Sequence, residues 1–281
     1  MEIKSQFFEV NSITLHAAVA GPEQGKVILF LHGFPEFSLG WKNQLLFFAE
    51  KGYRVIAPDQ RGYNLSSKPK GVKAYRFENL LADIVALIKQ LSTQKVILVG
   101  HDWGGGIAWE TAGQHPELIE KLIILNMPHL KVMGNTLKSN PKQLLRSWYF
   151  GFFQIPRLPE WLLSRSNFKL LAKSMVKTAN ENTFSRTDID QYKAAWQNST
   201  TVKTMINWYR AYKFSKLSLK RITVPTLILW GKKDAFLLHA MAEKSRQMCT
   251  AGKLVVLEDA SHWLHHEKAE QVNQYIFDFV D

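Results

Sequence analysis

The chain alternates between short apolar runs and longer segments in which apolar residues recur at helical spacing. Each run is bounded by Gly, Pro, Asp or His, which is typical of strands buried on both faces. Seven runs predict strands: Ile13–Val19, Val27–Leu31, Arg54–Ala57, Val96–Val99, Leu122–Leu125, Thr226–Leu229 and Leu254–Leu257. Two segments, Leu80–Leu91 and Glu267–Val280, have the apolar stripe of an amphipathic helix. The alternation predicts an α/β protein with a mostly parallel sheet covered by helices.

The strand–helix alternation stops after Met127-Pro128 and resumes at Val224-Pro225. The segment between them is rich in aromatic residues and contains three prolines, Pro141, Pro156 and Pro159. It predicts helices and loops without a strand. A helical insertion between two parallel strands lies over their carboxyl ends, where open α/β sheets bind ligands. We therefore expect a core made of residues 1–128 and 223–281, and a helical cap domain made of residues 129–222.

The net charge of +12 comes from one part of the chain. Residues 131–220 contain 16 Lys/Arg and 4 Asp/Glu, and the remaining residues balance. No DNA- or RNA-binding motif accompanies this surplus, so we do not expect a nucleic-acid partner. The apolar fraction of 46% is that of an ordinary globular protein. A single cysteine, Cys249, excludes an intrachain disulfide and a thiolate-rich metal cluster.

The first ten residues, MEIKSQFFEV, lack the pattern of a signal peptide. The purest apolar runs, such as Val27–Leu31, are too short to span a bilayer. These features predict a cytoplasmic protein without stable membrane insertion, as a monomer or a homodimer.

A candidate nucleophile follows the predicted strand Val96–Val99. The sequence Gly100-His101-Asp102-Trp103-Gly104 has the spacing of a nucleophile elbow, with Asp in place of the usual Ser. The two outer glycines permit the sharp strand-to-helix turn, with a helix expected to start near Gly105. A glycine-rich turn with an Asp N-cap has the same pattern, so the motif alone leaves both interpretations open.

Three further motifs follow predicted strands. His32-Gly33-Phe34-Pro35 stands where α/β-hydrolases place a loop that donates an oxyanion-hole N–H. Asp234 follows the strand Thr226–Leu229, and His262 follows Leu254–Leu257. The order nucleophile, acid and histidine is that of the α/β-hydrolase triad. Because carboxyl ends of parallel strands share one edge, we expect Asp102, Asp234 and His262 to meet there.

With these motifs, the sequence resembles α/β-hydrolases of the soluble epoxide hydrolase type over nearly its whole length. The resemblance rests on His32–Phe37 (HGFPEF), Pro58–Pro69 (PDQRGYNLSSKP), Gly100–Gly105 (GHDWGG), Lys232–Asp234 (KKD), Ser261–Trp263 (SHW), Ser147–Pro156 (SWYFGFFQIP) and Asn207–Arg210 (NWYR). It implies an α/β-hydrolase fold with a mostly parallel eight-stranded sheet and an inserted helical cap. It also implies that Tyr149 and Tyr209 point from the cap at the substrate. Asn64 stands where the family usually has Gly, and Ser261 replaces another common Gly.

An aspartate nucleophile restricts the type of reaction that the site can catalyse. Aspartate, with a reference pKa of about 3.9, is ionised at neutral pH and needs no base. Its attack on an sp³ carbon gives an ester, whereas attack on an ester or amide would give a mixed anhydride. The predicted reaction is therefore the opening of an epoxide to a diol through an ester on Asp102. Tyr149 and Tyr209 would donate to the epoxide oxygen, although aromatic packing in the cap is the alternative for both.

Hydrolysis of the ester requires a base and an oxyanion hole. His262, oriented by Asp234, would activate water, and the backbone N–H groups of Phe34 and Trp103 would stabilise the oxyanion. The side chains of Phe34, Trp103 and Trp263 are expected to contact the substrate. This mechanism requires no metal and no organic cofactor, and the expected partners are a small epoxide and water.

Two alternatives remain at this stage. Haloalkane dehalogenases share the Asp nucleophile and the following Trp, but many have Asn where this chain has Phe34. A catalytically silent, ligand-binding member of the fold is the second alternative, and such members generally lose a triad residue. The basic cap also suggests substrates with a distant carboxylate, such as epoxidised fatty acids.

Overall fold

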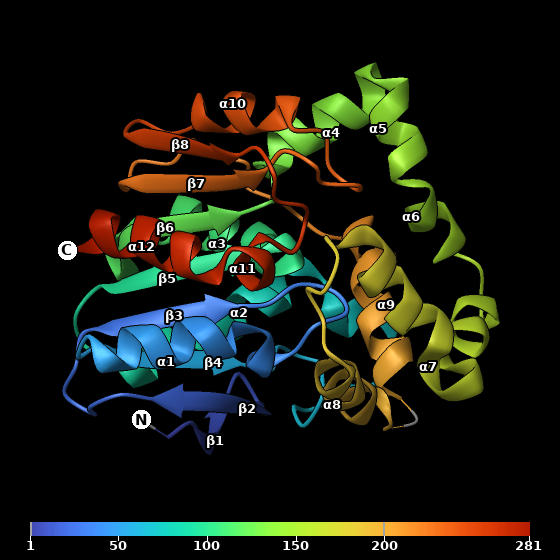
Figure 1. Ribbon diagram of the computed structural model, residues 1–281, viewed down its shortest axis with the longest axis horizontal. Coiled ribbons are helices and arrows are strands. Elements are labelled where there is room, and N and C mark those ends of the chain that lie inside the picture. Colours follow the sequence, from blue (N-terminus) through green and yellow to red (C-terminus); the bar gives the residue numbers. More distant parts are fainter. Residues whose placement is uncertain (1, 199) are drawn as a thin grey trace.

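The computed structural model describes residues 2–198 and 200–281, which form one eight-stranded sheet with helices around it (Figure 1). The strand order is β1-β2-β4-β3-β5-β6-β7-β8, and β2 alone runs antiparallel to its neighbours. The strands are β1 (Lys4–Val10), β2 (Ile13–Ala20), β3 (Val27–Leu31), β4 (Arg54–Pro58), β5 (Val96–His101), β6 (Ile119–Leu125), β7 (Thr226–Gly231) and β8 (Gly252–Leu257). The predicted fold class is therefore confirmed.

All seven predicted strands are present, as β2 to β8, and the eighth strand is the one that the apolar runs did not predict. β1 pairs only with β2, so it forms an edge of the sheet. Its first four residues are exposed, and Phe7 is 57% exposed. An edge strand with one solvent-facing side carries no continuous apolar run, which explains why the pattern missed it.

The two faces of the sheet are covered by different helices. In β3, Ile28 and Phe30 face one layer, and Leu29 and Leu31 face the other, because side chains alternate along a strand. Helices α1 and α12 cover the first face, and α2, α3 and α10 cover the second (Figure 1). Their bounds are α1 (Lys42–Glu50), α2 (Phe77–Leu91), α3 (Asp102–Gln114), α10 (Ala240–Arg246) and α12 (Ala269–Val280). A short helix, α11 (Leu264–Glu267), precedes α12. The predicted C-terminal helix is thus divided at Lys268.

In the described part of the segment between β6 and β7 there are six helices, which lie beyond the carboxyl ends of the parallel strands (Figure 1). They are α4 (Leu130–Ser139), α5 (Pro141–Arg146), α6 (Trp148–Phe152), α7 (Leu158–Thr178), α8 (Arg186–Trp196) and α9 (Thr201–Tyr212). α7 is interrupted at residues 165–168, where four successive residues leave helical geometry. The expectation of an inserted helical cap is confirmed, and its exact limits at residues 129 and 222 stay a prediction. Within the described residues, no helix is long and apolar enough to cross a membrane.

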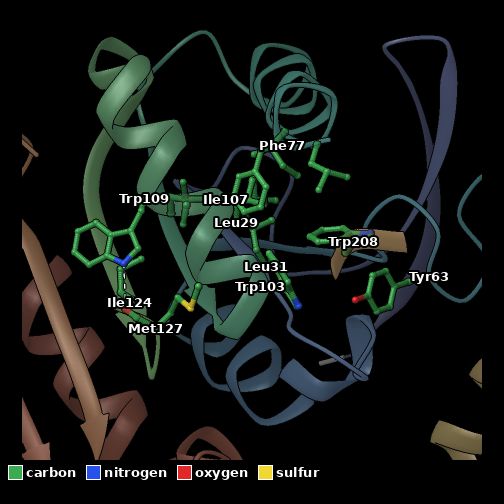
Figure 2. Packing of buried hydrophobic residues seen from close by; sticks show 14 of the residues in the cluster. Leu29, Leu31, Tyr63, Phe77, Trp103, Ile107, Trp109, Ile124, Met127 and Trp208 are labelled. Carbon is green, nitrogen blue, oxygen red and sulfur yellow. Dashed lines mark hydrogen bonds between the residues drawn. The ribbon is translucent and has the colours of Figure 1, made fainter. Parts of the chain in front are cut away.

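Two tryptophans of the cap donate hydrogen bonds to loops of the core. Trp208 of α9 donates from its indole N–H to the carbonyl oxygen of Arg61 at 3.0 Å. Trp196 of α8 donates to the carbonyl oxygen of Pro35 at 2.7 Å. Figure 2 shows Trp208 between Tyr63 and Trp103, whose rings lie 5.4 and 6.1 Å from it. Buried indole N–H groups need such partners, so these bonds fix the cap on the core.

The loop that receives Trp208 is held by a buried ion pair. Arg61 donates from Nε and Nη2 to the two carboxylate oxygens of Asp83 at 2.6 and 2.7 Å. Asp83 belongs to α2, and both side chains are almost fully buried. This bidentate geometry links the predicted motif at residues 58–69 to the helical layer.

Candidate active site

The candidate nucleophile Asp102 lies at the junction of a strand and a helix. β5 ends at His101 and α3 begins at Asp102, whose φ is 48°. The predicted helix start near Gly105 was therefore wrong by three residues. A side chain at Gly104 would collide with the carbonyl oxygen of Leu31, and one at Gly33 would collide with Asp102 itself. The glycines allow the elbow and the neighbouring loop to approach each other closely.

The carboxylate of Asp102 has one partner on each side. The backbone N–H of Phe34 donates to Oδ1 at 2.9 Å, and its role as an oxyanion donor stays a prediction. Nε2 of His262 lies 3.7 Å from Oδ2, beyond hydrogen-bond range but within ion-pair range. The side chain of Asp102 is 16% exposed. Trp103 follows directly in the first turn of α3, and its role as the second oxyanion donor stays a prediction.

His262 and Asp234 form a buried pair. Nδ1 of His262 lies 2.7 Å from Oδ2 of Asp234. The other oxygen of Asp234 accepts from the backbone N–H groups of Phe236 and Leu237 at 2.7 and 2.9 Å. The structure thus brings Asp102, Asp234 and His262 together from the ends of three strands, in the order nucleophile, histidine, acid across the site.

Asn126 holds the acid in place, and the sequence interpretation missed it. Its Nδ2 donates to Oδ2 of Asp234 at 2.5 Å, and its Oδ1 accepts from the backbone N–H of Gly231 at 2.7 Å. Asn126 follows β6 directly and has a φ of 39°. A polar residue between the buried Leu125 and Met127-Pro128 was the available signal, since it ends a strand as Asp102 does.

The charges of the site stabilise a protonated histidine. Burial by itself lowers the pKa of His262, but the carboxylates of Asp234 and Asp102 outweigh it and raise that pKa to about 9. Burial raises the pKa of Asp234, yet His262 and Asn126 bring it below its usual range. The resting site therefore combines an imidazolium with two carboxylates.

The two predicted tyrosines lie close to each other, and both line a cavity together with Asp102. Tyr149 comes from α6 and Tyr209 from α9, and their ring centroids are 5.8 Å apart. Burial, and then the negative charge of Asp102, raise the pKa of both phenols well above the usual value. Both hydroxyls therefore remain protonated over the physiological pH range and are available as donors.

These groups line one cavity of about 560 Å³. Its polar lining residues are Asp102, His262, Tyr149, Tyr209, Arg146, Ser174 and Thr178. The other lining residues are apolar and include the predicted contacts Phe34 and Trp263. Trp103, the third predicted contact, lines a small adjoining cavity of about 30 Å³ together with both tyrosines and Asp102. A groove of about 590 Å³ beside α2 contains none of the predicted site residues. We therefore place the site in the cavity of about 560 Å³.

A buried carboxylate, Glu36, is connected to His262 through His101. One hydroxyl and three imidazoles surround it at 2.7–3.3 Å: Tyr192, His101, His265 and His266. His101 also places Nε2 2.9 Å from the carbonyl oxygen of His262. Burial raises the pKa of Glu36, but His265 and His266 lower it well below its usual range.

The sequence did not predict a role for Glu36, because the histidines that surround it lie more than sixty residues away along the chain. The potential ligand atoms of Glu36, His101 and His265 lie within 4.8 Å of one another, as a metal site would require. The expectation that the protein uses no metal stays a prediction.

A family model for the "alpha/beta hydrolase fold" matches residues 26–269. The chain belongs to this family. Among its relatives, the "AB hydrolase superfamily protein YfhM" of Bacillus subtilis is 44% identical over 280 residues, which cover 99% of this chain and 98% of that protein. "Epoxide hydrolase 4" of Mus musculus is 37% identical over 96% of this chain and 77% of its own length.

This chain also has the same fold as solved structures of epoxide hydrolases. A crystal structure of a Bacillus megaterium epoxide hydrolase in complex with an inhibitor superposes with a TM-score of 0.89. The two sequences are 32% identical, over 98% of this chain and 99% of the other. The chain is thus an epoxide-hydrolase-like member of the α/β-hydrolase family.

Proposed function

We propose that the protein is an epoxide hydrolase that converts epoxides to vicinal diols through a covalent ester on Asp102. One observation carries the proposal: a carboxylate and two protonated phenols line the same, mostly apolar cavity. A carboxylate can attack an epoxide carbon while a phenol donates to the oxygen that leaves it.

In the first step, a carboxylate oxygen of Asp102 forms a bond to an epoxide carbon, and the carbon–oxygen bond of the ring breaks. Tyr149 or Tyr209 donates its proton to that oxygen, which gives a hydroxyalkyl ester and one phenolate. The protonated His262 returns a proton to the phenolate, directly or through water. The site then holds a neutral ester, two phenols and a neutral imidazole.

Formation of the ester lowers the pKa of His262, which allows this residue to act as a base. Asp102 loses its negative charge when it is alkylated, so one of the three carboxylates that raise the pKa of His262 (Asp234, Asp102 and Glu36) is no longer charged. The imidazole then gives up its proton more easily and can accept one from water. Asp234, fixed by Asn126, keeps the ring oriented through Nδ1.

In the second step, water loses a proton to Nε2 of His262 and attacks the carbonyl carbon of Asp102. The backbone N–H groups of Phe34 and Trp103 stabilise the oxyanion. Collapse breaks the carbon–oxygen bond of the ester, and the proton of the added hydroxyl passes to the departing alkoxide. The products are the diol and a site with its carboxylate, imidazolium and both phenols restored.

The decisive experiment is a single turnover of styrene oxide in water enriched in heavy oxygen. In the proposed route, the diol of the first turnover takes its new oxygen from Asp102, and the heavy atom appears in the peptide that contains this residue. An Asp102→Ala variant should give no diol. Label that enters the diol directly, with none in the peptide, would contradict the ester route.

A haloalkane dehalogenase is the second candidate, because an Asp nucleophile also displaces halide. Release of bromide from 1-bromobutane, together with no diol from styrene oxide, would move the function there. Within the proposed function, the basic cap favours substrates with a distant carboxylate. A ratio of activities toward an epoxy fatty acid and its methyl ester that does not change with ionic strength would remove this preference.

A further inference from the structure

Exposed apolar side chains are concentrated on one part of the cap. Of eleven large apolar side chains that are exposed among the described residues, eight lie between residues 144 and 176: Leu144, Leu145, Trp148, Ile155, Leu158, Trp161, Leu170 and Val176. Leu145 is 74% exposed and Trp148 is 66% exposed. Scattered exposed apolar residues are common, but a group of this size marks an interaction surface.

Basic side chains are interleaved with these apolar ones. Residues 142–177 contain seven Lys/Arg, all exposed: Lys142, Arg146, Arg157, Arg165, Lys169, Lys173 and Lys177. Glu160 is the one acidic residue in this range, and its carboxylate is already paired with Arg210 at 2.5 and 3.1 Å. Within the part of the chain that the structure describes, none of the seven has an ion-pair partner.

This surface, which we call the cap face (residues 142–177 of α5, α6 and α7), adjoins the catalytic cavity. α5, α6 and α7 form the outer border of the molecule on the side away from the sheet (Figure 1). Leu145, Trp148 and Leu170 belong to the exposed group and also line the cavity that contains Asp102. Three of the eight exposed apolar side chains are therefore also part of the wall of the site.

We propose that the cap face binds the surface of an anionic lipid bilayer. A second copy of the chain would place two strongly basic surfaces against each other, which is unfavourable. A nucleic acid would neutralise the charge but would leave exposed leucines and tryptophans without apolar partners. An anionic bilayer meets both requirements, because Lys and Arg contact the headgroups while Trp and Leu enter the boundary below them.

Binding in this orientation turns the cavity toward the bilayer. An apolar epoxide dissolved in the lipid would then reach Asp102 along Leu145 and Trp148 without crossing bulk water. This consequence rests on the proposed function, whereas lipid binding itself does not, so the two can fail separately.

The test is co-sedimentation of the full chain with vesicles of phosphatidylcholine, with and without 30% phosphatidylglycerol. Strong binding is expected only to the anionic vesicles, and it should weaken as salt is raised. The triple variant Lys169→Glu, Lys173→Glu, Lys177→Glu should bind at least tenfold more weakly. A matched triple variant, Lys4→Glu, Lys95→Glu, Lys253→Glu, changes the net charge equally at exposed positions of the core and should bind like the unchanged protein.

The apolar contribution is tested by Trp161→Ser with Val176→Ser, which keeps every charge and lies outside the cavity lining. This variant should also bind several-fold more weakly, while its activity on water-soluble styrene oxide stays unchanged. Equal losses in the two triple variants would show attraction by net charge alone and would overturn the proposal. So would the absence of binding to anionic vesicles, or concentration-dependent dimerisation that these substitutions abolish.

Discussion

Nε2 of His262 and Oδ2 of Asp102 face each other across 3.7 Å, while Nδ1 of the same ring is 2.7 Å from Asp234. The imidazole therefore lies between two carboxylates, one of which disappears as a charge during the proposed reaction.

The Asp102→Asn variant should lower the pKa of His262 from its value of about 9, because it removes a negative charge that favours the protonated ring. Asp234→Asn should lower it further, since Asp234 is the stronger of the two influences. Titration of the ring followed by NMR measures both shifts. An unchanged midpoint in Asp102→Asn would show that the nucleophile does not control the base.

Replacement of His262 by Gln should separate the two steps. The nucleophile and both tyrosines remain, so an ester should form and then persist. Mass spectrometry after incubation with styrene oxide should find one added substrate mass on the peptide that contains Asp102. The double variant with Asp102→Ala is the control and should carry no adduct. Steady turnover by His262→Gln would assign the base to another group.

Removal of either cap hydroxyl should slow the first step alone. Tyr149→Phe and Tyr209→Phe should each reduce the rate of ester formation by about a hundredfold, as loss of one donor to a developing oxyanion typically does. Hydrolysis of the ester should change little. Stopped-flow fluorescence resolves the two phases. Tyr212→Phe, next to Trp103 but outside the main cavity, is the matched control and should retain both rates.

Asn126 should act as a positioning residue. Asn126→Gly removes the amide but retains the left-handed backbone conformation, so strain does not confuse the result. Because Asn126 helps to lower the pKa of Asp234, its loss should weaken the orientation of His262. We expect a lower kcat with little change in KM. The acid limb of the pH profile should move to higher pH, because the pKa of Asp234 rises when Asn126 is lost. A change confined to thermal stability would reduce the role of Asn126 to packing.

The Arg61–Asp83 pair should contribute strongly to folding. Asp83→Ala leaves a buried guanidinium without its carboxylate, and such losses cost about 3–5 kcal/mol of unfolding free energy. Urea denaturation measures this cost. The exposed pair Lys232–Glu258 is the comparison, and Glu258→Ala should cost less than about 1 kcal/mol. Equal costs for the two variants would contradict a special role of the buried pair.

The sequence predicted those features that depend on local pattern. Buried parallel strands are continuous apolar runs, so β2 to β8 were predictable, and motifs at their carboxyl ends located Asp102, Asp234 and His262. β1 was missed because an edge strand exposes one side. The interruption of α7 at residues 165–168 was missed because its sequence contains neither Pro nor Gly.

Contacts between distant residues account for the rest. Asn126 and Asp234 are 108 positions apart, and Glu36 and His266 are 230 positions apart. Neither pair forms a motif, and only the folded sheet brings them together. The exposure of Leu145 and Trp148 was equally hidden, because aromatic and aliphatic residues in a helical cap suggest packing as readily as a surface.

The position of His262 after β8 has a consequence for the order in which the enzyme is synthesised. The ribosome makes Asp102 first, then Tyr149 and Tyr209 of the cap, then Asp234, and His262 last of the five. In the proposed mechanism, the groups that form the ester are thus translated before the base that hydrolyses it. Synthesis of β8 and of the loop after it is therefore the step that would complete the proposed second half-reaction, the hydrolysis of the ester.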